Sequence, residues 1–394
     1  MQQHFDVVIA GGAVMGSSIA CHLAMHPGFS GSILVVEPDM SYQKSASALS
    51  AGSIRQQFSQ RVNIEISLYG IGFLRAIGER LAVAGDRPDI GLREGGYLYL
   101  GGEEARPIFL ENNAIQRAKG ADITLLDAQG LAGEFPWLNI ADLTIGSFGR
   151  SGEGWFDGYG LMQAFRAKAR ALGVEYRQNR VIGTSRHGPR VTSIRLDDGS
   201  EIACGFFVNA AGASGARDIV EMLGQRVAVY AKKRSVFAFS CREKLPKHPL
   251  IIDKSGVWWR PEGEGYICGF SPDDDDEIDQ KDDFTVDWPL FEEIIWPALA
   301  HRIPAFESLR PGRAWAGHYD MHRLDHNAVV GRVTGFENAL IACGFSGHGL
   351  QQSPAVGRGL AELIVEGRYT TLDLSDLGME RVTAGRPLRE RNVI

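Results

Sequence analysis

The chain has 394 residues, 44% of them hydrophobic and 23% charged, and this length predicts two domains or one large domain with an insertion. The composition is ordinary for a globular protein and excludes disordered and collagen-like chains. The 41 basic and 48 acidic residues give a net charge of -7, so we expect no nucleic-acid partner.

The five cysteines are scattered along the chain without a CxxC pair. This pattern is neither a disulfide framework nor a zinc site, and it fits a reducing compartment. The apolar stretch from Val7 to Met25 is interrupted by glycines and serines, and no Lys or Arg precedes it. It therefore predicts neither a signal peptide nor a membrane span. We expect a cytoplasmic protein without a metal site.

The first predicted element is a buried strand, because Phe5–Ala10 is an apolar run with several β-branched residues. It leads through Gly11–Gly16 into a predicted helix over 17–24, the context that a dinucleotide-binding fingerprint requires. Ala13 takes the place of the middle glycine in GxGxxG, and its methyl group still lets backbone N–H groups approach a pyrophosphate. The helix amino terminus would add partial positive charge for the phosphates.

A second buried strand is predicted over 32–37, which completes a βαβ unit. Glu37 lies 21 positions beyond Gly16, where a carboxylate accepts hydrogen bonds from the adenosine ribose. No arginine follows it, which disfavours a 2′-phosphate. The combination predicts dinucleotide binding; the alternative is a glycine-rich turn in an ordinary α/β sheet.

The elements that follow predict a mixed fold. Arg93–Leu100 alternates like a strand, and Gly158–Leu172 is an amphipathic helix. Strands on either side of the turn at 197–200 form a hairpin. Phe206–Asn209 is expected to return to the nucleotide-binding sheet, and residues from about 226 to 319 hold aromatic and β-branched runs suited to a substrate pocket.

The last third of the chain predicts three further features. Residues 257–269 form a hairpin on which only one of Trp258 and Trp259 faces the pocket, since alternate strand residues face opposite ways. The acidic run Asp273–Asp279 lacks the spaced ligands of an EF-hand and predicts a solvated loop. An amphipathic helix is expected from about Pro354 to Glu366.

The choice of dinucleotide depends on the rest of the chain. Gly152–Gly154 and Gly263–Gly265 have the wrong spacing for a second fingerprint and no helix after them. The glycine-rich segments 208–213 and 342–349 return late in the chain to strand ends. Distant segments that contribute to one site suit the long, extended FAD better than NAD. A flavin-independent NAD dehydrogenase stays open as an alternative.

Four motifs occur in order: Gly11–Ser18, Ser50–Phe58, Asn209–Gly212 and Gly344–Gln352. Together they resemble the D-amino-acid-oxidase-type FAD superfamily, the branch with sarcosine oxidase, dimethylglycine oxidoreductases and glycine oxidase. Ser53–Phe58 is most similar to the subgroup called FAD-dependent oxidoreductase domain-containing proteins. The resemblance implies an α/β plus α+β fold, with a Rossmann-like FAD-binding domain and a substrate domain built on an antiparallel sheet. We expect the FAD-binding domain over 1–80, 148–225 and 320–394, and the substrate-binding domain over 81–147 and 226–319.

The resemblance also implies how FAD is held. Relatives with covalent flavin use a cysteine near the segment 315–320 or an early histidine, and this chain has Gly317 in the first place and no histidine in Ser45–Ser50. Noncovalent FAD is therefore expected. Its predicted contacts are Gly11, Gly12, Ala13, Val14, Met15, Gly16, Glu37, Pro38, Ser45, Ser47, Ser50, Ala51, Gly52, Val181, Ala210, Ala211, Gly212, Gly344, Ser346, Gly347, His348, Gly349, Leu350 and Gln351.

Four side chains are predicted to be catalytic: Arg55, Tyr319, His348 and Trp258. The turn with His348 precedes a helix, whose N–H groups can stabilise negative charge on a reduced flavin; the alternative is an exposed capping turn. In sarcosine oxidase an arginine in the segment of Arg55 anchors the substrate carboxylate, which a bidentate guanidinium does well. Alternatively Arg55 pairs with a structural acid or FAD, and Arg260, Arg313 and Arg323 are rival anchors.

The expected reaction is oxidation of the C–N bond of an amine that carries a carboxylate, such as sarcosine, dimethylglycine or iminodiacetate. The neutral amine would lose a hydride to flavin N5, and the imine would then hydrolyse. Sarcosine oxidase has a lysine where Gln351 stands, and the lysine that helps oxygen react has no counterpart in 265–269. Oxygen or an electron-transfer partner therefore stays open as acceptor, for a monomer or a homodimer. The alternative function is a flavoprotein assembly or interaction factor.

Overall fold

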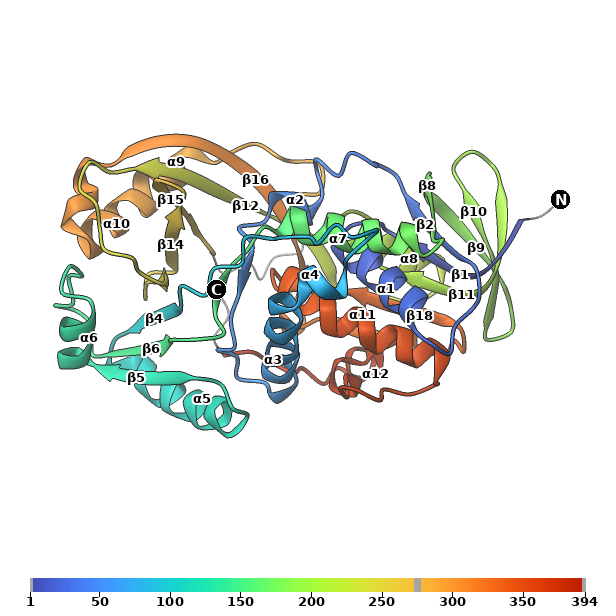
Figure 1. The fold of residues 1–394 in the computed structure, drawn as a ribbon, viewed down its shortest axis with the longest axis horizontal. Coiled ribbons are helices and arrows are strands. Elements are labelled where there is room, and N and C mark those ends of the chain that lie inside the picture. Colours follow the sequence, from blue (N-terminus) through green and yellow to red (C-terminus); the bar gives the residue numbers. More distant parts are fainter. Residues whose placement is uncertain (1–2, 273–277, 392–394) are drawn as a thin grey trace.

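The computed structural model describes residues 3–272 and 278–391. Two large sheets lie side by side with helices packed around them (Figure 1). Of the acidic run predicted as a solvated loop, residues 273–277 lie outside the described residues, while Asp279 forms an ion pair with Arg217 at 2.6 Å.

The first sheet carries the predicted βαβ unit and is mainly parallel. Its strands run in the order β17-β18-β11-β1-β2-β8, and β11 also pairs with the hairpin partner β10. The strands are β1 (Gln3–Ala10), β2 (Ile33–Glu37), β8 (Glu175–Gln178), β9 (Val181–His187), β10 (Arg190–Leu196), β11 (Glu201–Asn209), β17 (Val329–Arg332) and β18 (Ala339–Cys343). The hairpin at 197–200 and the return of 206–209 to this sheet are thus confirmed.

Strand β1 is buried on both faces, which explains its unbroken apolar sequence. Val7 and Ile9 pack in one core with α1 (Val14–Met25), α3 (Arg61–Arg75), α7 (Gly158–Ala171) and α11 (Gly349–Val365). Val8 and Ala10 pack in a second core with α8 (Gly212–Met222). The sheet therefore lies between two helical layers, with the carboxyl ends of β1, β2 and β11 at one edge.

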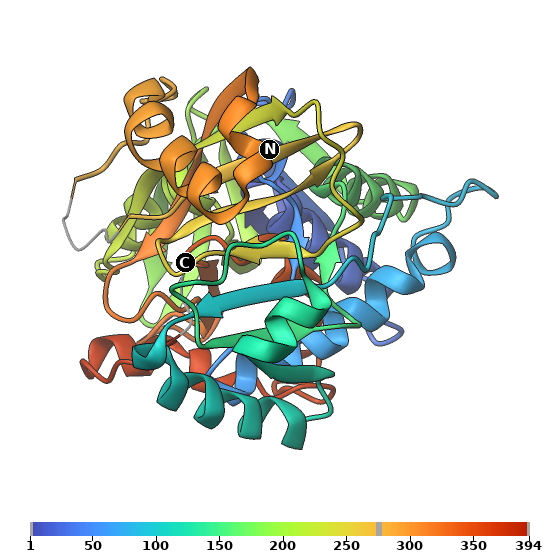
Figure 2. The same ribbon diagram turned by 90° about the vertical axis from the view of Figure 1, so that its left-hand side faces the viewer.

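The second sheet has the order β16-β12-β15-β14-β13-β4-β6-β5, in which β13 and β4 pair in parallel and every other pair is antiparallel. In Figure 2 the orange helices α9 and α10 lie above this sheet and the teal helix α5 lies below it. The strands are β4 (Tyr97–Gly101), β5 (Ile123–Asp127), β6 (Ile145–Gly149), β12 (Val229–Ser240), β13 (Leu250–Ile252), β14 (Val257–Glu262), β15 (Gly265–Phe270) and β16 (Arg310–His322).

Short elements complete the fold. A two-stranded sheet pairs β3 (Ser53–Ile54) with β7 (Gly154–Trp155). The remaining helices are α2 (Ala46–Leu49), α4 (Ile77–Arg80), α5 (Arg106–Ala118), α6 (Ala128–Glu134), α9 (Trp288–Leu290), η2 (Phe291–Ile295), α10 (Trp296–Arg302) and α12 (Met379–Thr383). Single 3-10 turns are η1 (Glu103–Ala105), η3 (Pro304–Ser308) and η4 (Ser375–Leu377).

Helix α11, predicted over 354–366, begins earlier than the sequence predicts. It starts at Gly349 rather than near Pro354, which lies inside it. A proline in a helix leaves the carbonyl four residues before it without its usual donor. Here that carbonyl belongs to Leu350, and the hydroxyl of Ser353 donates to it at 2.9 Å. The helix therefore tolerates the proline.

Other predicted bounds also differ. The strand expected over Arg93–Leu100 begins only at Tyr97, while Arg93 forms an isolated bridge with Trp155. The predicted domain boundaries at 147/148 and 319/320 fall inside β6 and β16, because both strands continue past them. The predicted α/β plus α+β fold is confirmed, with one mainly parallel and one mainly antiparallel sheet.

Candidate active site

Residues of both sheets line a cavity of about 420 Å³, here called the larger cavity. The carboxyl ends of β1, β2 and β11 contribute Gly11, Glu37 and Ala210 to it. The edge beyond the carboxyl ends of parallel strands is where ligands bind in open α/β sheets. From the second sheet come Trp258 and Tyr319.

The fingerprint residues pack so tightly that two of them must be glycine. Gly11 has a φ of +96°, and a Cβ on it would lie 2.4 Å from the carbonyl oxygen of Ala210. A Cβ on Gly16 would lie only 1.8 Å from the carbonyl oxygen of Gly11. Ala13, the N-cap of α1, makes no side-chain cap, and the N–H of Val14 donates to the hydroxyl of Ser47 at 3.2 Å; Ala13, Val14 and Met15 all line the larger cavity.

The acidic residue of the fingerprint is held by the same turn. Oε2 of Glu37 accepts the N–H of Gly12 at 2.7 Å, and Oε1 accepts the N–H of Asp39 at 3.0 Å. Burial raises the pKa of the Glu37 carboxyl above its ordinary value, against these hydrogen bonds, which lower it. Glu37 lines the larger cavity at the carboxyl end of β2, where this fold places a ribose.

A second cavity of about 60 Å³, the smaller cavity, adjoins the larger one and shares lining residues with it, including Trp258, Tyr319 and Gly347. Gly347 has a φ of +92°, and a Cβ on it would lie 2.5 Å from the ring of Tyr319. The tyrosine ring is therefore packed directly on the turn before α11, where the two cavities meet.

Arg55 and His348, which are 293 residues apart, meet at the smaller cavity. Nη2 of Arg55 donates to Nε2 of His348 at 2.8 Å, and Nη1 donates to the carbonyl oxygen of Gln57. A guanidinium can only donate, so Nε2 of His348 is the unprotonated ring nitrogen. Burial and the charge of Arg55 hold the pKa of His348 well below its ordinary value, so the histidine is neutral at pH 7.

Side chains around Arg55 hold its position. The guanidinium lies 4.1 Å from the ring centre of Phe58 and 5.6 Å from that of Tyr99. Its backbone N–H donates to the amide oxygen of Gln351 at 2.8 Å. Only 3% of Arg55 is exposed, so it is a buried cation at the wall of a cavity. Such a group needs an anionic partner or good hydrogen bonds.

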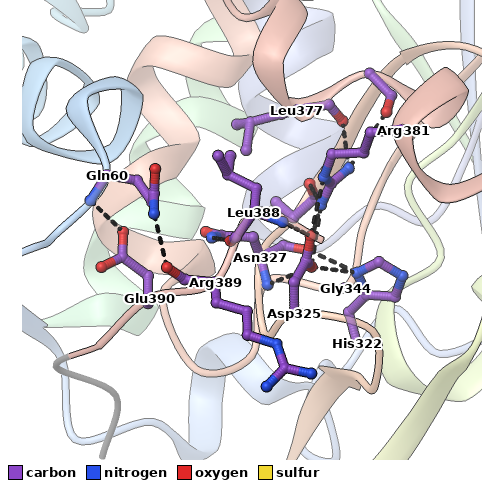
Figure 3. A network of polar contacts seen from close by, with 12 residues as sticks. Gln60, His322, Asp325, Asn327, Gly344, Leu377, Arg381, Leu388, Arg389 and Glu390 are labelled. Carbon is purple, nitrogen blue, oxygen red and sulfur yellow. Dashed lines mark hydrogen bonds and ion pairs between the residues drawn. The ribbon is translucent and has the colours of Figure 1, made fainter. Parts of the chain in front are cut away.

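The C-terminal segment forms hydrogen bonds with the residues that follow Arg55. Its Glu390 accepts the backbone N–H of Ser59 at 2.6 Å and that of Gln60 at 3.1 Å. The side chain of Gln60 in turn donates to the carbonyl oxygen of Arg389 at 2.7 Å, as Figure 3 shows. Glu390 thereby satisfies donors at the start of α3, whose N-cap residue makes no side-chain cap.

The tryptophan pair of β14 alternates as predicted. Trp258 lines both cavities, whereas Trp259 is fully buried in the core of the second sheet. His318 lines the larger cavity, where its Nε2 lies 2.8 Å from the carbonyl oxygen of Asp283. The hairpin strands β14 and β15 thus present one tryptophan to the cavities.

The predicted contacts divide into two groups. Most line one of the two cavities, and those that line neither are Gly12, Gly16, Gly52, Val181 and Gly344. Val181 packs in a core cluster instead. Of the rival arginines, Arg260 is turned toward Glu262 and the carbonyl oxygen of Ala51, while Arg313 and Arg323 are exposed.

Several lining residues were missed by sequence reasoning. Arg234 and Lys44 line the larger cavity, and Tyr97, Leu250 and Ile252 line the smaller one. Tyr97 belongs to the alternating run 93–100, which could have suggested it. Strand β13 has only three residues, and so short an apolar run gives no usable periodicity.

The family model described as FAD dependent oxidoreductase matches residues 6–363. The chain belongs to this family. This oxidoreductase is 41% identical to FAD-dependent oxidoreductase domain-containing protein 1 of Xenopus laevis, over 99% of this chain and 85% of the relative. It is similar to the L-proline dehydrogenase from P. horikoshii, with 25% identity, a TM-score of 0.85, and 98% and 100% of the two chains covered. Iminodiacetate oxidase from Chelativorans sp. BNC1 has the same fold, with 20% identity, a TM-score of 0.75, and 94% and 98% covered.

FAD is the cofactor of this family, and the residues present fit it. Gly11 and Glu37 both line the larger cavity, at the positions where this fold places a pyrophosphate and a ribose. Gly347 and the uncapped start of α11 line the same cavity. The NAD alternative is therefore not supported.

Other features concern membranes, metals and thiols. In the described ranges, none of the helices is both long and apolar enough to cross a bilayer. Among the residues placed by the structure, no cluster of three or more His, Cys, Asp or Glu side chains could hold a metal ion. All five cysteines are free thiols, and four of them are buried.

Proposed function

We propose that this oxidoreductase oxidises the C–N bond of an amine that carries one carboxylate and a compact apolar substituent, such as sarcosine or dimethylglycine. The observation that carries the proposal is the buried Arg55 guanidinium at the smaller cavity, next to the larger cavity that fits FAD. Among the described residues that line the smaller cavity, Arg55 is the one arginine or lysine.

Arg55 would bind the substrate carboxylate. Burial strengthens an ion pair with a cation that is already desolvated, provided that geometry is good. The contacts to Gln57 and His348 fix the guanidinium, so little conformational freedom is left to lose when the carboxylate binds. His348 is neutral and does not compete with Arg55 for the anion.

Four side chains of neighbouring strands would contact the rest of the substrate. Leu250 pairs with Tyr97 across β13 and β4, and Ile252 pairs with Trp258 across β13 and β14. All four line the smaller cavity and form a wall that is apolar apart from the tyrosine hydroxyl and the indole N–H. Such a wall favours a methyl or a small ring over the second carboxylate of iminodiacetate, whose burial without a partner is unfavourable.

When bound, FAD supplies the acceptor for the hydride that leaves the substrate carbon. The substrate nitrogen must be neutral, because its lone pair forms the new C=N bond as the C–H bond breaks. The positive charge of Arg55 disfavours an ammonium group in the same cavity, so a dedicated side-chain base is not required. Water then adds to the released imine and gives a carbonyl compound and an amine.

The comparisons support an amino-acid-type substrate at a coarse level. One similar structure is an L-proline dehydrogenase, and another chain with this fold is an iminodiacetate oxidase. Gln351 lines the smaller cavity and is uncharged, unlike the lysine at this position in sarcosine oxidase. We propose that FAD is bound noncovalently and that either oxygen or an electron-transfer partner is the final acceptor.

Anaerobic mixing of the holoenzyme with sarcosine, dimethylglycine, L-proline and iminodiacetate tests the proposal. We expect the yellow flavin absorption to bleach with at least one monocarboxylate. Bleaching by none of them would refute amine oxidation. Bleaching that is fastest with iminodiacetate would refute the apolar wall as a substrate contact and leave the reaction type standing.

A further inference from the structure

We propose that Glu153 is a positioning residue, which holds Arg55 in place through Gln57. The inference rests on the proposed anchoring role of Arg55. Glu153 lies between β6 and β7, on the stretch of chain that leaves the second sheet, and its side chain is fully buried. A buried carboxylate normally requires hydrogen-bond donors on both oxygens.

Within the described part of the chain, the donors to this carboxylate come from the two residues after Arg55. Oε1 of Glu153 accepts the backbone N–H groups of Gln56 and Gln57, the latter at 3.1 Å. Oε2 accepts the side-chain amide of Gln57 at 2.8 Å. One carboxylate therefore holds two consecutive peptide groups and one side chain, and hydrogen bonds to a charged acceptor are the strong ones.

Gln57 connects Glu153 to the guanidinium. Its N–H groups donate to Glu153, and its carbonyl oxygen accepts Nη1 of Arg55. The same side-chain amide also donates to the carbonyl oxygen of Tyr97 at 3.0 Å, in the wall of the smaller cavity. A shift of Gln57 would therefore displace the Arg55 guanidinium and also change its distance from Tyr97 in the cavity wall.

The chain around Glu153 leaves space for this carboxylate. A Cβ on Gly149 would lie 1.8 Å from Oε2 of Glu153. Gly152 has a φ of +73°, and a Cβ there would lie 2.3 Å from the side-chain nitrogen of Gln56. These two close approaches explain the glycines at positions 149 and 152.

Glu153 does not itself pair with Arg55, which leaves the guanidinium turned toward His348 and the smaller cavity. When Glu153 is ionised, its negative charge nevertheless attracts the positive charge of Arg55 through the buried interior. The arrangement separates two tasks: Arg55 contacts the substrate, and Glu153 fixes the peptide segment from which Arg55 extends.

The test compares four variants of the holoenzyme: Glu153→Ala, Glu153→Gln, Arg55→Ala and Glu134→Gln. Glu134 is a partly exposed carboxylate paired with Arg150 and serves as the matched control. The first readout is the Kd of methoxyacetate, a carboxylate without an oxidisable amine, measured from the change in flavin absorption. The second is the pair of KM and kcat values for the best substrate of the panel.

For Glu153→Ala we expect Kd and KM to rise about tenfold, because a misplaced guanidinium binds the carboxylate poorly, while kcat changes much less and FAD is retained. Glu153→Gln keeps one acceptor oxygen but places its new side-chain NH2 group opposite an N–H donor of Gln57. We therefore expect a smaller rise of Kd and KM than for the alanine variant. Glu153→Gln also keeps the test possible if the alanine variant does not fold. Glu134→Gln should match the wild type.

The outcomes separate the two proposals. If Arg55→Ala raises Kd and both Glu153 variants keep the wild-type Kd and KM, the positioning role is wrong and the anchor stands. If Arg55→Ala leaves Kd unchanged, the anchor itself is wrong. An equal fall in kcat and FAD content without a change in Kd would mark Glu153 as merely structural and overturn the inference.

Discussion

Replacing Glu153 by glutamine should change how stability depends on pH. Burial raises the pKa of the Glu153 carboxyl from its ordinary value of 4.5 to about 7, although hydrogen bonds from Gln56 and Gln57 and the charge of Arg55 oppose the rise. The native state thus binds this proton more tightly than the unfolded chain does. The contribution of the Glu153 carboxyl to the free energy of unfolding is therefore fully present below pH 4.5 and is lost as the pH rises through about 7.

The size of the effect follows from the two pKa values. At about 1.4 kcal/mol per pH unit, the gap corresponds to about 3 kcal/mol, most of it between about pH 5 and about pH 8. The titratable groups nearby are Arg55, Tyr97 and Tyr99. Arginine stays charged throughout this range. Burial raises the pKa of Tyr97 to about 12 and that of Tyr99 well above its ordinary value, so both stay neutral.

The assay is urea unfolding followed by tryptophan fluorescence, with FAD in excess, at about pH 5 and about pH 8. The free energy of unfolding of Glu153→Gln minus that of the wild type should increase by about 2–3 kcal/mol toward the higher pH. Glu134→Gln should show no such increase, because Arg150 holds the pKa of Glu134 below its ordinary value. If the difference in unfolding free energy between Glu153→Gln and the wild type is the same at both pH values, the raised pKa of the buried Glu153 carboxyl is refuted.

Four further outcomes are expected. Arg55→Ala should raise KM by about tenfold or more with FAD retained, whereas the exposed Arg313→Ala should not; equal KM values would remove Arg55 as anchor. Gly16→Ala should yield colourless protein, since its Cβ would lie 1.8 Å from a backbone oxygen; a yellow variant with wild-type FAD content would contradict this. Acid precipitation of the wild type should release the flavin into the supernatant, and flavin in the pellet would show a covalent link. Glu390→Ala should lower the free energy of unfolding by about 2–4 kcal/mol in urea titrations, since the buried side-chain amide of Asn63 and the partly buried N–H groups of Ser59 and Gln60 lose their acceptor; an unchanged value would show that water replaces the carboxylate.

Much of the fold could be predicted from neighbouring residues alone. The apolar run before Gly11, the turn and the helix after it specify a βαβ unit, because periodicity and turn chemistry act over a few residues. The same holds for α7, for the hairpin at 197–200, and for the alternation that buries Trp259 and exposes Trp258 to the cavities. The order of the four motifs was enough to indicate FAD.

Contacts between distant segments were decided by the tertiary structure. The hydrogen bond between Arg55 and His348 depends on where β3 and α11 lie, and no local pattern encodes that. The run around Glu153 was only a glycine pair with unsuitable spacing until the fold placed its carboxylate beside Gln57. Sequence patterns report which face of an element is apolar, whereas sheet order and packing determine which faces meet, and the candidate site is built where they meet.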